Sequence, residues 1–180
     1  FNNFNNRNAT PKKQTPMDWD YILNETKNTA RRIYIAGGEP FYMKEVYNFL
    51  YKLSKYKWNL DNTKLIIQTN TVSNTNKLLD ILKKFKLLQI GVSVDGWGSV
   101  NEIIRFPTKH ETFIENLNQF AAIDAHMYFN ITLQALNLPN VDILIEESKK
   151  WTESYEVYRL HTPNYLSIDA LKPTVIEDVL

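Results

Sequence analysis

Residues 33–40 read Ile-Tyr-Ile-Ala-Gly-Gly-Glu-Pro, and this stretch decides the fold that we predict for the chain. The alternating β-branched and aromatic residues at its start predict a buried strand. Gly37 and Gly38 can turn the backbone or let a ligand approach it, and Pro40 cannot continue a sheet ladder. Glu39 is therefore expected at a strand's carboxyl end, where α/β proteins bind ligands. A turn with a solvated carboxylate is the alternative at this point.

The rest of the chain predicts strands that alternate with helices. Strands are expected to begin near residues 33, 65, 88, 127 and 155, with helices at about 18–31, 43–56, 75–85, 111–123 and 140–150. This spacing suits repeated βαβ units, and right-handed crossovers make the sheet parallel. The sequence predicts an α/β fold, either a partial barrel or an open doubly wound sheet, because periodicity does not choose between them.

The 180 residues suit one ordered domain with flanking segments. We expect an irregular leader at residues 1–16, the α/β domain at 17–161 and a C-terminal extension at 162–180. The start has neither an initiator Met nor the pattern of a signal peptide, so the chain is expected to begin in the middle of a longer protein.

Composition narrows the classes of partner and site. The net charge of +1 does not indicate nucleic acid or an anionic membrane as a partner. No apolar run in the sequence reaches the length that is needed to span a bilayer. We expect a cytoplasmic protein. The absence of cysteine excludes disulfides and thiolate metal sites within these residues. His110, His126 and His161 lie far apart in sequence, so no metal site is predicted.

Polar side chains follow several of the predicted strands, and a parallel sheet would bring them to one rim. They are Glu39, Thr69, Asn70, Ser93, Asp95, Gln134 and Asn137. Carboxylates there would suit an ammonium group, amides and hydroxyls a ribose, and Arg105 a carboxylate. The rim therefore predicts a site for a small zwitterion that carries a sugar, although exposed loops are polar in any case. Glu111 and Glu115 are expected to form only a solvated helix face.

The motifs in order resemble the radical S-adenosylmethionine (SAM) superfamily. They are Ile-Ala-Gly-Gly-Glu-Pro at 35–40, Gln-Thr-Asn at 68–70, and Val-Ser-Val-Asp-Gly at 92–96 with Arg105 downstream. The pattern looks most like the branch with SPASM or twitch C-terminal domains, and residues 161–168 are similar to the segment that follows the last strand in twitch-type members. The resemblance covers residues 17–161.

The resemblance implies a partial (β/α) barrel, of six strands in the family, that binds SAM across its strand ends. Glycines 37 and 38 with Glu39 would meet the methionyl ammonium, and Arg105 the carboxylate. The implied cofactor-binding residues are Gly37, Gly38, Glu39, Pro40, Thr69, Asn70, Ser93, Asp95, Arg105, Gln134 and Asn137. In the family, a [4Fe-4S] cluster donates one electron to SAM, which is cleaved into methionine and a 5′-deoxyadenosyl radical. Among members of the family, the resemblance implies a twitch-type enzyme that modifies a peptide or protein, and 7-carboxy-7-deazaguanine synthase is the alternative.

The chain departs from the family in one respect, because the family's Cys-x3-Cys-x2-Cys cluster loop is absent. We expect the first barrel strand and this loop to precede Phe1 in the parent protein. The alternative is a degenerate relative that lost the cluster and binds SAM, a nucleoside or a partner protein. In both cases the chain alone is expected to be inactive in radical chemistry. An ordinary SAM-dependent methyltransferase is poorly supported, because the glycine-rich first loop that is usual in such enzymes is absent from this sequence.

Overall fold

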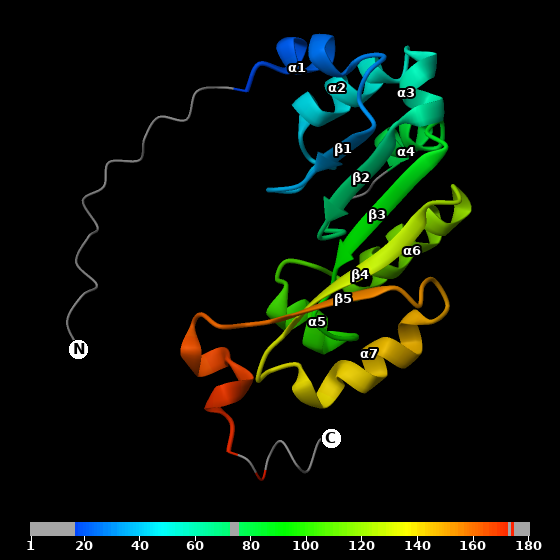
Figure 1. Ribbon diagram of the computed structural model, residues 1–180. Helices are drawn as coiled ribbons and strands as arrows, with labels where there is room; N and C mark the ends of the chain where they lie inside the picture. The colour runs from blue at the N-terminus through cyan, green and yellow to red at the C-terminus, as the bar shows by residue number, and fades with distance from the viewer. Residues whose placement is uncertain (1–16, 73–75, 173, 175–180) are drawn as a thin grey trace, which may run out of the picture.

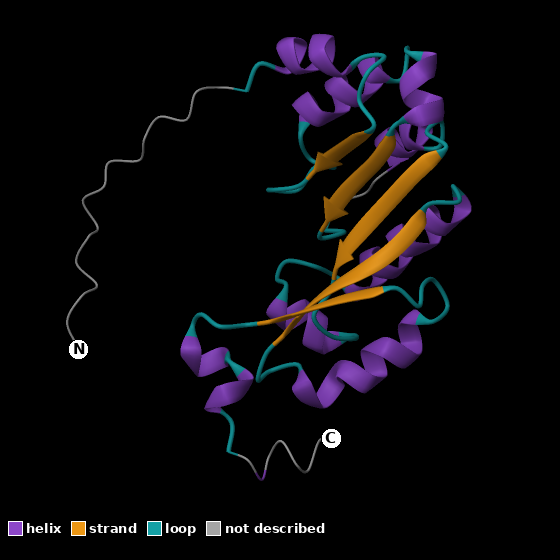
Figure 2. Cartoon of the chain, viewed as in Figure 1, coloured by secondary structure: helices purple, strands orange, loops and turns teal. Residues whose placement is uncertain are grey.

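The computed structural model describes residues 17–72, 76–172 and 174. Within them, five strands form one parallel sheet in the order β1-β2-β3-β4-β5, and their arrows run the same way in Figure 2. The strands are β1 Arg32–Ile35, β2 Lys64–Thr69, β3 Leu87–Ser93, β4 His126–Leu133 and β5 Tyr155–Arg159. Each strand pairs with the next one in sequence, so the winding never reverses and the sheet stays open. The predicted α/β partial barrel is confirmed, and the doubly wound alternative is wrong.

Helices cover one side of this sheet (Figure 1). They are α1 Trp19–Thr26, α2 Lys44–Leu53, α3 Lys57–Asn62, α4 Asn76–Leu82, α5 Ser99–Ile104, α6 His110–Ala122 and α7 Val141–Ser148. Helices on one side follow from right-handed crossovers between strands that are neighbours in both sequence and space. In the described part of the chain, no helix has the length and apolar character needed to cross a membrane.

The core lies between the sheet and the helices. Alternate strand residues point toward the helices, and Leu65, Ile90 and Phe129 there are fully buried. They meet the apolar stripes of the helices, such as Leu50 of α2 and Leu117 of α6, which are also fully buried. The period of two in the strands and of 3.6 in the helices therefore converge on one apolar layer.

The opposite, concave face of the sheet is mostly polar. Its residues are Arg32, Tyr34, Lys64, Ile66, Gln68, Leu87, Gln89, Gly91, Ser93, His126, Tyr128, Asn130, Thr132, Glu156 and Tyr158, the positions that alternate with the core. Polar side chains on the face without helices leave that face open to ligands, because no apolar layer needs to cover it.

The start of the chain differs from the prediction at two helices. Asp18 caps α1 by accepting a hydrogen bond from Tyr21 N, but the helix ends at Thr26 rather than near residue 31. Asn59 causes this end, because its amide donates to Thr26 O and accepts from Asn28 N. Asn59 belongs to α3, a helix that periodicity did not predict because it has only six residues.

The two ends of the chain were predicted to be irregular. The predicted leader at residues 1–16 lies outside the described residues, as does Thr75, the predicted first residue of the helix at 75–85. The described part of the C-terminal extension forms short 3₁₀ helices at Asn164–Leu166 and Ile168–Ala170. It is fastened to the loop after β4, where Ala135 N donates to Leu166 O at 2.8 Å.

Candidate functional site

The Gly-Gly-Glu-Pro loop follows β1 and presents its backbone to solvent. Gly37 and Gly38 are exposed and have φ values of +92° and +58°, which side-chain-bearing residues seldom adopt. A Cβ at Gly37 would meet nothing within 4 Å. The glycines are therefore needed for the turn, and the space beside them is open to a ligand. Pro40, in contrast, is buried and ends the loop.

Glu39 is held in a fixed position at this rim. Its Oε1 accepts hydrogen bonds from Thr69 Oγ1 at 2.8 Å and from Phe41 N at 3.2 Å, and its Oε2 accepts from Asn70 N at 2.7 Å. A carboxylate offers about four acceptor positions, so these bonds leave about one on Oε2. The contact also ties the loop after β1 to the end of β2, as the parallel arrangement predicted.

Arg105, at the end of α5, connects the loops after β2 and β3. Its Nε lies 2.8 Å from Asp95 Oδ2, an ion pair in which the N–H is not aligned for a hydrogen bond. Its Nη1 donates to Asn70 Oδ1 at 3.1 Å. Asp95 Oδ1 accepts from Thr132 N at 2.6 Å, so both oxygens of this buried carboxylate have protein partners. Asp95 therefore positions Arg105, whose remaining N–H groups are left for an anion.

The turn after β3, residues 95–98, is fixed by two asparagines. Asn101 accepts from Asp95 N at 3.0 Å, and Asn140 accepts from Trp97 N at 2.6 Å. Asn140 ends the 3₁₀ helix Leu138–Asn140 that follows β4 and directly precedes α7, so this bond links the third and fourth strand ends. A Cβ at Gly96 would lie 2.6 Å from Val100 Cγ1, which explains the glycine. Sequence reasoning did not identify Asn140, and nothing in its own neighbourhood signals this role.

The other predicted rim residues divide into two groups. Asn137 is fully buried and holds its own loop, accepting from Gln134 N and donating to Thr132 O, each at 2.8 Å. Gln134 is also buried. Ser93 is half-buried at the end of β3, on the concave face. The structure thus brings Glu39, Asn70, Asp95 and Arg105 into one connected chain of contacts, whereas Asn137 serves the loop after β4.

Gln68 forms a hydrogen-bonded bridge between β2 and β4 on the concave face, which the sequence did not predict. Gln68 of β2 donates to Tyr128 Oη and accepts from Asn130 Nδ2, both on β4, at 2.5 Å. It reaches them by lying across Gly91 of β3, where a Cβ would lie 2.2 Å from Gln68 Oε1. The alternation Tyr-Phe-Asn-Ile at 128–131 was the available signal, because it places Tyr128 and Asn130 on the polar face.

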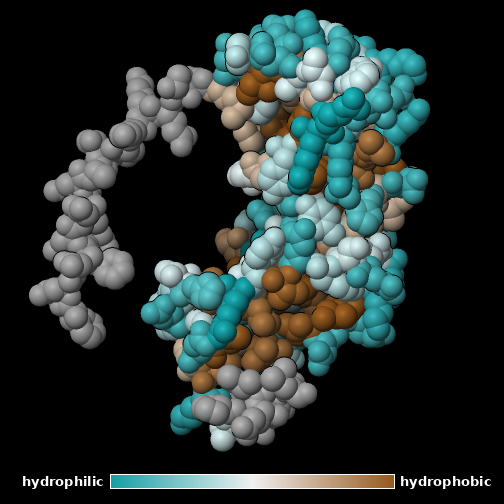
Figure 3. All heavy atoms as spheres, in the orientation of Figure 1, coloured by the Kyte–Doolittle hydropathy of each residue, from teal (hydrophilic) through white to brown (hydrophobic). Residues whose placement is uncertain are grey.

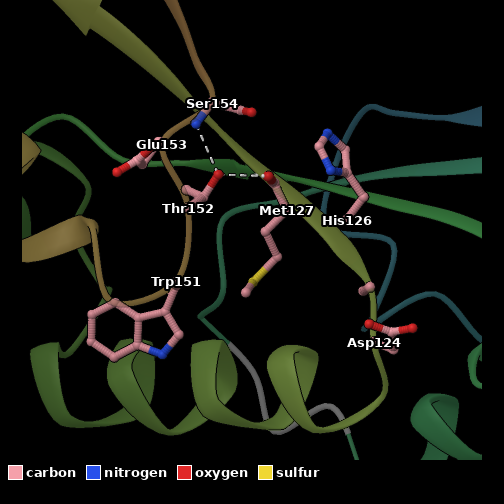
Figure 4. Close-up of a pocket in the computed structure, with 8 residues that line it drawn as sticks. Asp124, His126, Met127, Trp151, Thr152, Glu153 and Ser154 are labelled. Atoms are coloured by element: carbon pink, nitrogen blue, oxygen red, sulfur yellow. Dashed lines mark hydrogen bonds between the residues drawn. The ribbon is translucent and has the colours of Figure 1, made fainter.

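A polar hollow of about 450 Å³ lies at the amino ends of β4 and β5, away from the Gly-Gly-Glu-Pro rim. Figure 4 shows Asp124, His126 and Glu153 around it, with side chains that do not converge on one point. Thr152 fastens this region by donating to Met127 O and accepting from Ser154 N. Among the described residues, no three His, Cys, Asp or Glu side chains are placed to hold a metal ion.

The rim carries chemical groups of the kinds that the amino-acid end of SAM needs, whereas the chain carries no ligands for the iron–sulfur cluster. The open glycine ridge, the free acceptor position on Glu39 and the remaining donors of Arg105 suit an ammonium and a carboxylate of one amino acid. A [4Fe-4S] cluster needs thiolate ligands, and the sequence contains no cysteine. The residues present therefore offer the cluster no ligand set.

Comparison with solved structures finds the same fold in proteins of low sequence identity. Streptococcus suis SuiB bound to S-adenosylmethionine matches with a TM-score of 0.61 and 19% identity, over 82% of this chain and 34% of SuiB. SuiB bound to its precursor peptide SuiA matches with 0.60 and 19%, over 78% and 31%. Native anSMEcpe with bound AdoMet and a peptide matches with 0.63 and 17%, over 87% and 47%. The chain thus spans about a third of SuiB and less than half of anSMEcpe.

Comparison with sequences gives the family. No curated protein matches the chain significantly. The family described as the Radical SAM superfamily matches residues 4–141, which is more than half of the chain and includes the first four strands with the Gly-Gly-Glu-Pro loop. Because this match agrees with the singly wound sheet and with the structural neighbours, we conclude that the chain belongs to the radical SAM superfamily.

Proposed function

We propose that the chain is the SAM-binding part of a radical SAM enzyme that modifies a peptide or protein. The observation that carries the proposal is the connected rim of Glu39, Asn70, Arg105 and Asp95 at the carboxyl ends of β1 to β3. The peptide substrate is supported by the similar structures of SuiB with its precursor peptide and of anSMEcpe with a peptide. A cytoplasmic location and a C-terminal domain of the SPASM or twitch type remain part of the proposal.

In this proposal each rim residue has a separate task. Glu39 accepts the ammonium of SAM with the acceptor position that its protein partners leave, and Gly37 and Gly38 let the methionyl part lie against the backbone. Arg105, oriented by Asp95, donates to the carboxylate. Ser93 and Asn70 lie toward the ribose. Held this way, SAM supplies a 5′-deoxyadenosyl group as the source of a radical, while the chain orients the cofactor and shields it from solvent.

The cluster would come from cysteines outside these 180 residues, because none lies within them. The same fact favours a second function, a cluster-free module that binds SAM or a related nucleoside. The coding sequence upstream of Phe1 separates the two. A Cys-x3-Cys-x2-Cys loop there supports the enzyme, and an uninterrupted frame without one leaves only the binding module.

Both functions require SAM binding, which calorimetry of the purified chain measures without iron. Glu39→Gln removes the charge that meets the ammonium, and a charge-assisted hydrogen bond contributes about 1.5 to 3 kcal/mol. We therefore expect the SAM dissociation constant to rise by about 10- to 150-fold.

The matched control is Glu111→Gln, which removes one carboxylate from the exposed start of α6 and should leave SAM affinity unchanged. Because Glu39 also holds the loop, urea unfolding of both variants must show that Glu39→Gln remains folded at the titration temperature. An unchanged dissociation constant in folded Glu39→Gln would mean that Glu39 is only a turn residue. The absence of heat with millimolar SAM for the unsubstituted chain would refute both functions.

A further inference from the structure

The concave face contains a hollow of about 550 Å³ that extends across all five strands. Arg32 of β1 and Lys64 of β2 line one side, and Glu156 of β5 lines the other, with Glu153 just before it. Tyr128 of β4 lies between them. These side chains belong to the face without helices, and Figure 3 shows mainly hydrophilic atoms across the middle of the molecule. The hollow lies toward the amino ends of the strands, away from the Gly-Gly-Glu-Pro rim.

The charges that line this hollow are separated by sign and are not neutralised by one another. Within the described residues, none of Arg32, Lys64, Glu153 and Glu156 forms an ion pair, although surface lysines elsewhere in the chain do so repeatedly. Glu156 accepts only a hydrogen bond from Tyr158 Oη, at 2.9 Å. A positive side and a negative side therefore face the same space without meeting.

The negative charge of Glu156 affects another side chain that lines the hollow, Tyr128. Burial raises the pKa of the Tyr128 hydroxyl, and the negative charge of Glu156 raises it further. Asn130, which belongs to the Gln68 bridge, is the register partner of Glu156. The carboxylate thus lies next to the fixed polar groups of β4.

The width of the sheet sets the separation of the two charged sides. Lys64 on β2 and Glu156 on β5 are three strand spacings apart across the sheet, which is about 14 Å at about 4.8 Å per spacing. The strand registers also place Glu156 six residues further along its strand than the position opposite Lys64, which adds to the separation. That distance excludes a direct ion pair. An extended peptide advances about 3.3 Å per residue, so two of its residues three positions apart are separated by about 10 Å along the backbone. The side chains of these two residues, together with those of Lys64 and Glu156, extend across the remaining distance to both sides.

We propose that this hollow binds a substrate segment with one acidic and one basic side chain about three residues apart, the acid toward Arg32 and Lys64 and the base toward Glu156. The inference rests on the proposed function, because it takes the substrate to be a peptide or protein. It adds the charge pattern that selects the substrate.

Three acetylated and amidated tetrapeptides test the pattern: Asp-Gly-Gly-Lys, Asp-Gly-Gly-Asp and Lys-Gly-Gly-Lys. Their dissociation constants are measured by NMR titration of the purified chain, with up to 10 mM peptide. We expect Asp-Gly-Gly-Lys to bind about fivefold more tightly than either like-charged peptide, because an exposed ion pair contributes at most about this factor. Lys64→Glu and Glu156→Lys should each remove the preference.

Lys84→Glu and Glu115→Lys are the matched controls, since both residues are exposed on the helical side of the sheet, and they should keep the preference. Equal binding of the three peptides, no binding of any, or a preference that survives Glu156→Lys would overturn the inference. SAM calorimetry on the same sample separates the two claims. Normal SAM binding without a peptide preference refutes only the hollow, and absent SAM binding refutes the proposed function.

Discussion

Gly91→Ala tests whether the absence of a side chain on β3 is what allows Gln68 to bridge to β4. The new Cβ would lie 2.2 Å from Gln68 Oε1 and 2.5 Å from its Nε2, so the Gln68 side chain must leave. Its hydrogen bonds to Tyr128 and Asn130 would then be lost.

The expected cost follows from two opposing effects. Each lost hydrogen bond destabilises by about 0.5 to 1.5 kcal/mol, and the lower entropy of the unfolded chain with alanine restores about 0.4 to 1 kcal/mol. We therefore expect a net loss of about 1 kcal/mol in the free energy of unfolding. Urea denaturation followed by circular dichroism measures it, with the slope compared between variants to verify that only stability has changed.

A double-mutant cycle isolates the bridge from other effects of the methyl group. In a Gln68→Ala background nothing remains to clash, so Gly91→Ala should be neutral or stabilise the chain by up to about 1 kcal/mol. The same loss in both backgrounds would refute the reasoning, because the alanine would then be acting on the strand itself and not through Gln68.

Three further outcomes follow from the contacts of single side chains. Asn59→Ala should lower the free energy of unfolding by about 1 to 3 kcal/mol, because it leaves the end of α1 without its partners; Asn62→Ala, on the same helix, is the comparison. Tyr128→Phe should reduce the loss of stability at alkaline pH, measured as the free energy of unfolding in urea. The pKa of Tyr128 is raised in the folded chain, so the contribution of this hydroxyl to stability is fully present below pH 10.0 and is lost as the pH rises through the pKa of the folded state. For Asp61 the pH dependence of stability has the opposite sign, because hydrogen bonds from Lys86 and then Lys57 lower its pKa in the folded chain. Its contribution to stability is present above pH 3.8 and is lost as the pH falls. The free energy of unfolding of Asp61→Asn, measured by urea denaturation, should therefore depend less on pH in that range.

The strands and the rim could be predicted because they depend on local patterns. Alternation and turn residues located each strand, and the parallel rule then placed Glu39 and Asn70 at the same edge, where the structure joins them by a hydrogen bond. The short helix α3 could not be predicted, since six residues carry too little periodicity. Its buried Asn59 makes a tertiary contact with the end of α1, which no local pattern records.

The roles of individual rim residues were harder to predict than their positions. Sequence spacing placed Asp95 near the ligand but could not show that Arg105 and Thr132 N would occupy both of its oxygens. In the same way, Asn137 lies where it was expected but its amide is used by its own loop. Which lone pairs remain free depends on three-dimensional partners, and no one-dimensional pattern records them.

The order of the strands has a consequence for how the chain is made. Within the described residues, each strand after β1 pairs with the strand that precedes it in sequence, so each of these strands finds a partner already present when it leaves the ribosome. Synthesis at about 5 to 20 residues per second would deliver a strand–helix unit every few seconds, and no strand edge would have to wait for a partner encoded far downstream. Assembly can therefore proceed vectorially, with nascent chains gaining protease resistance in steps as each unit emerges.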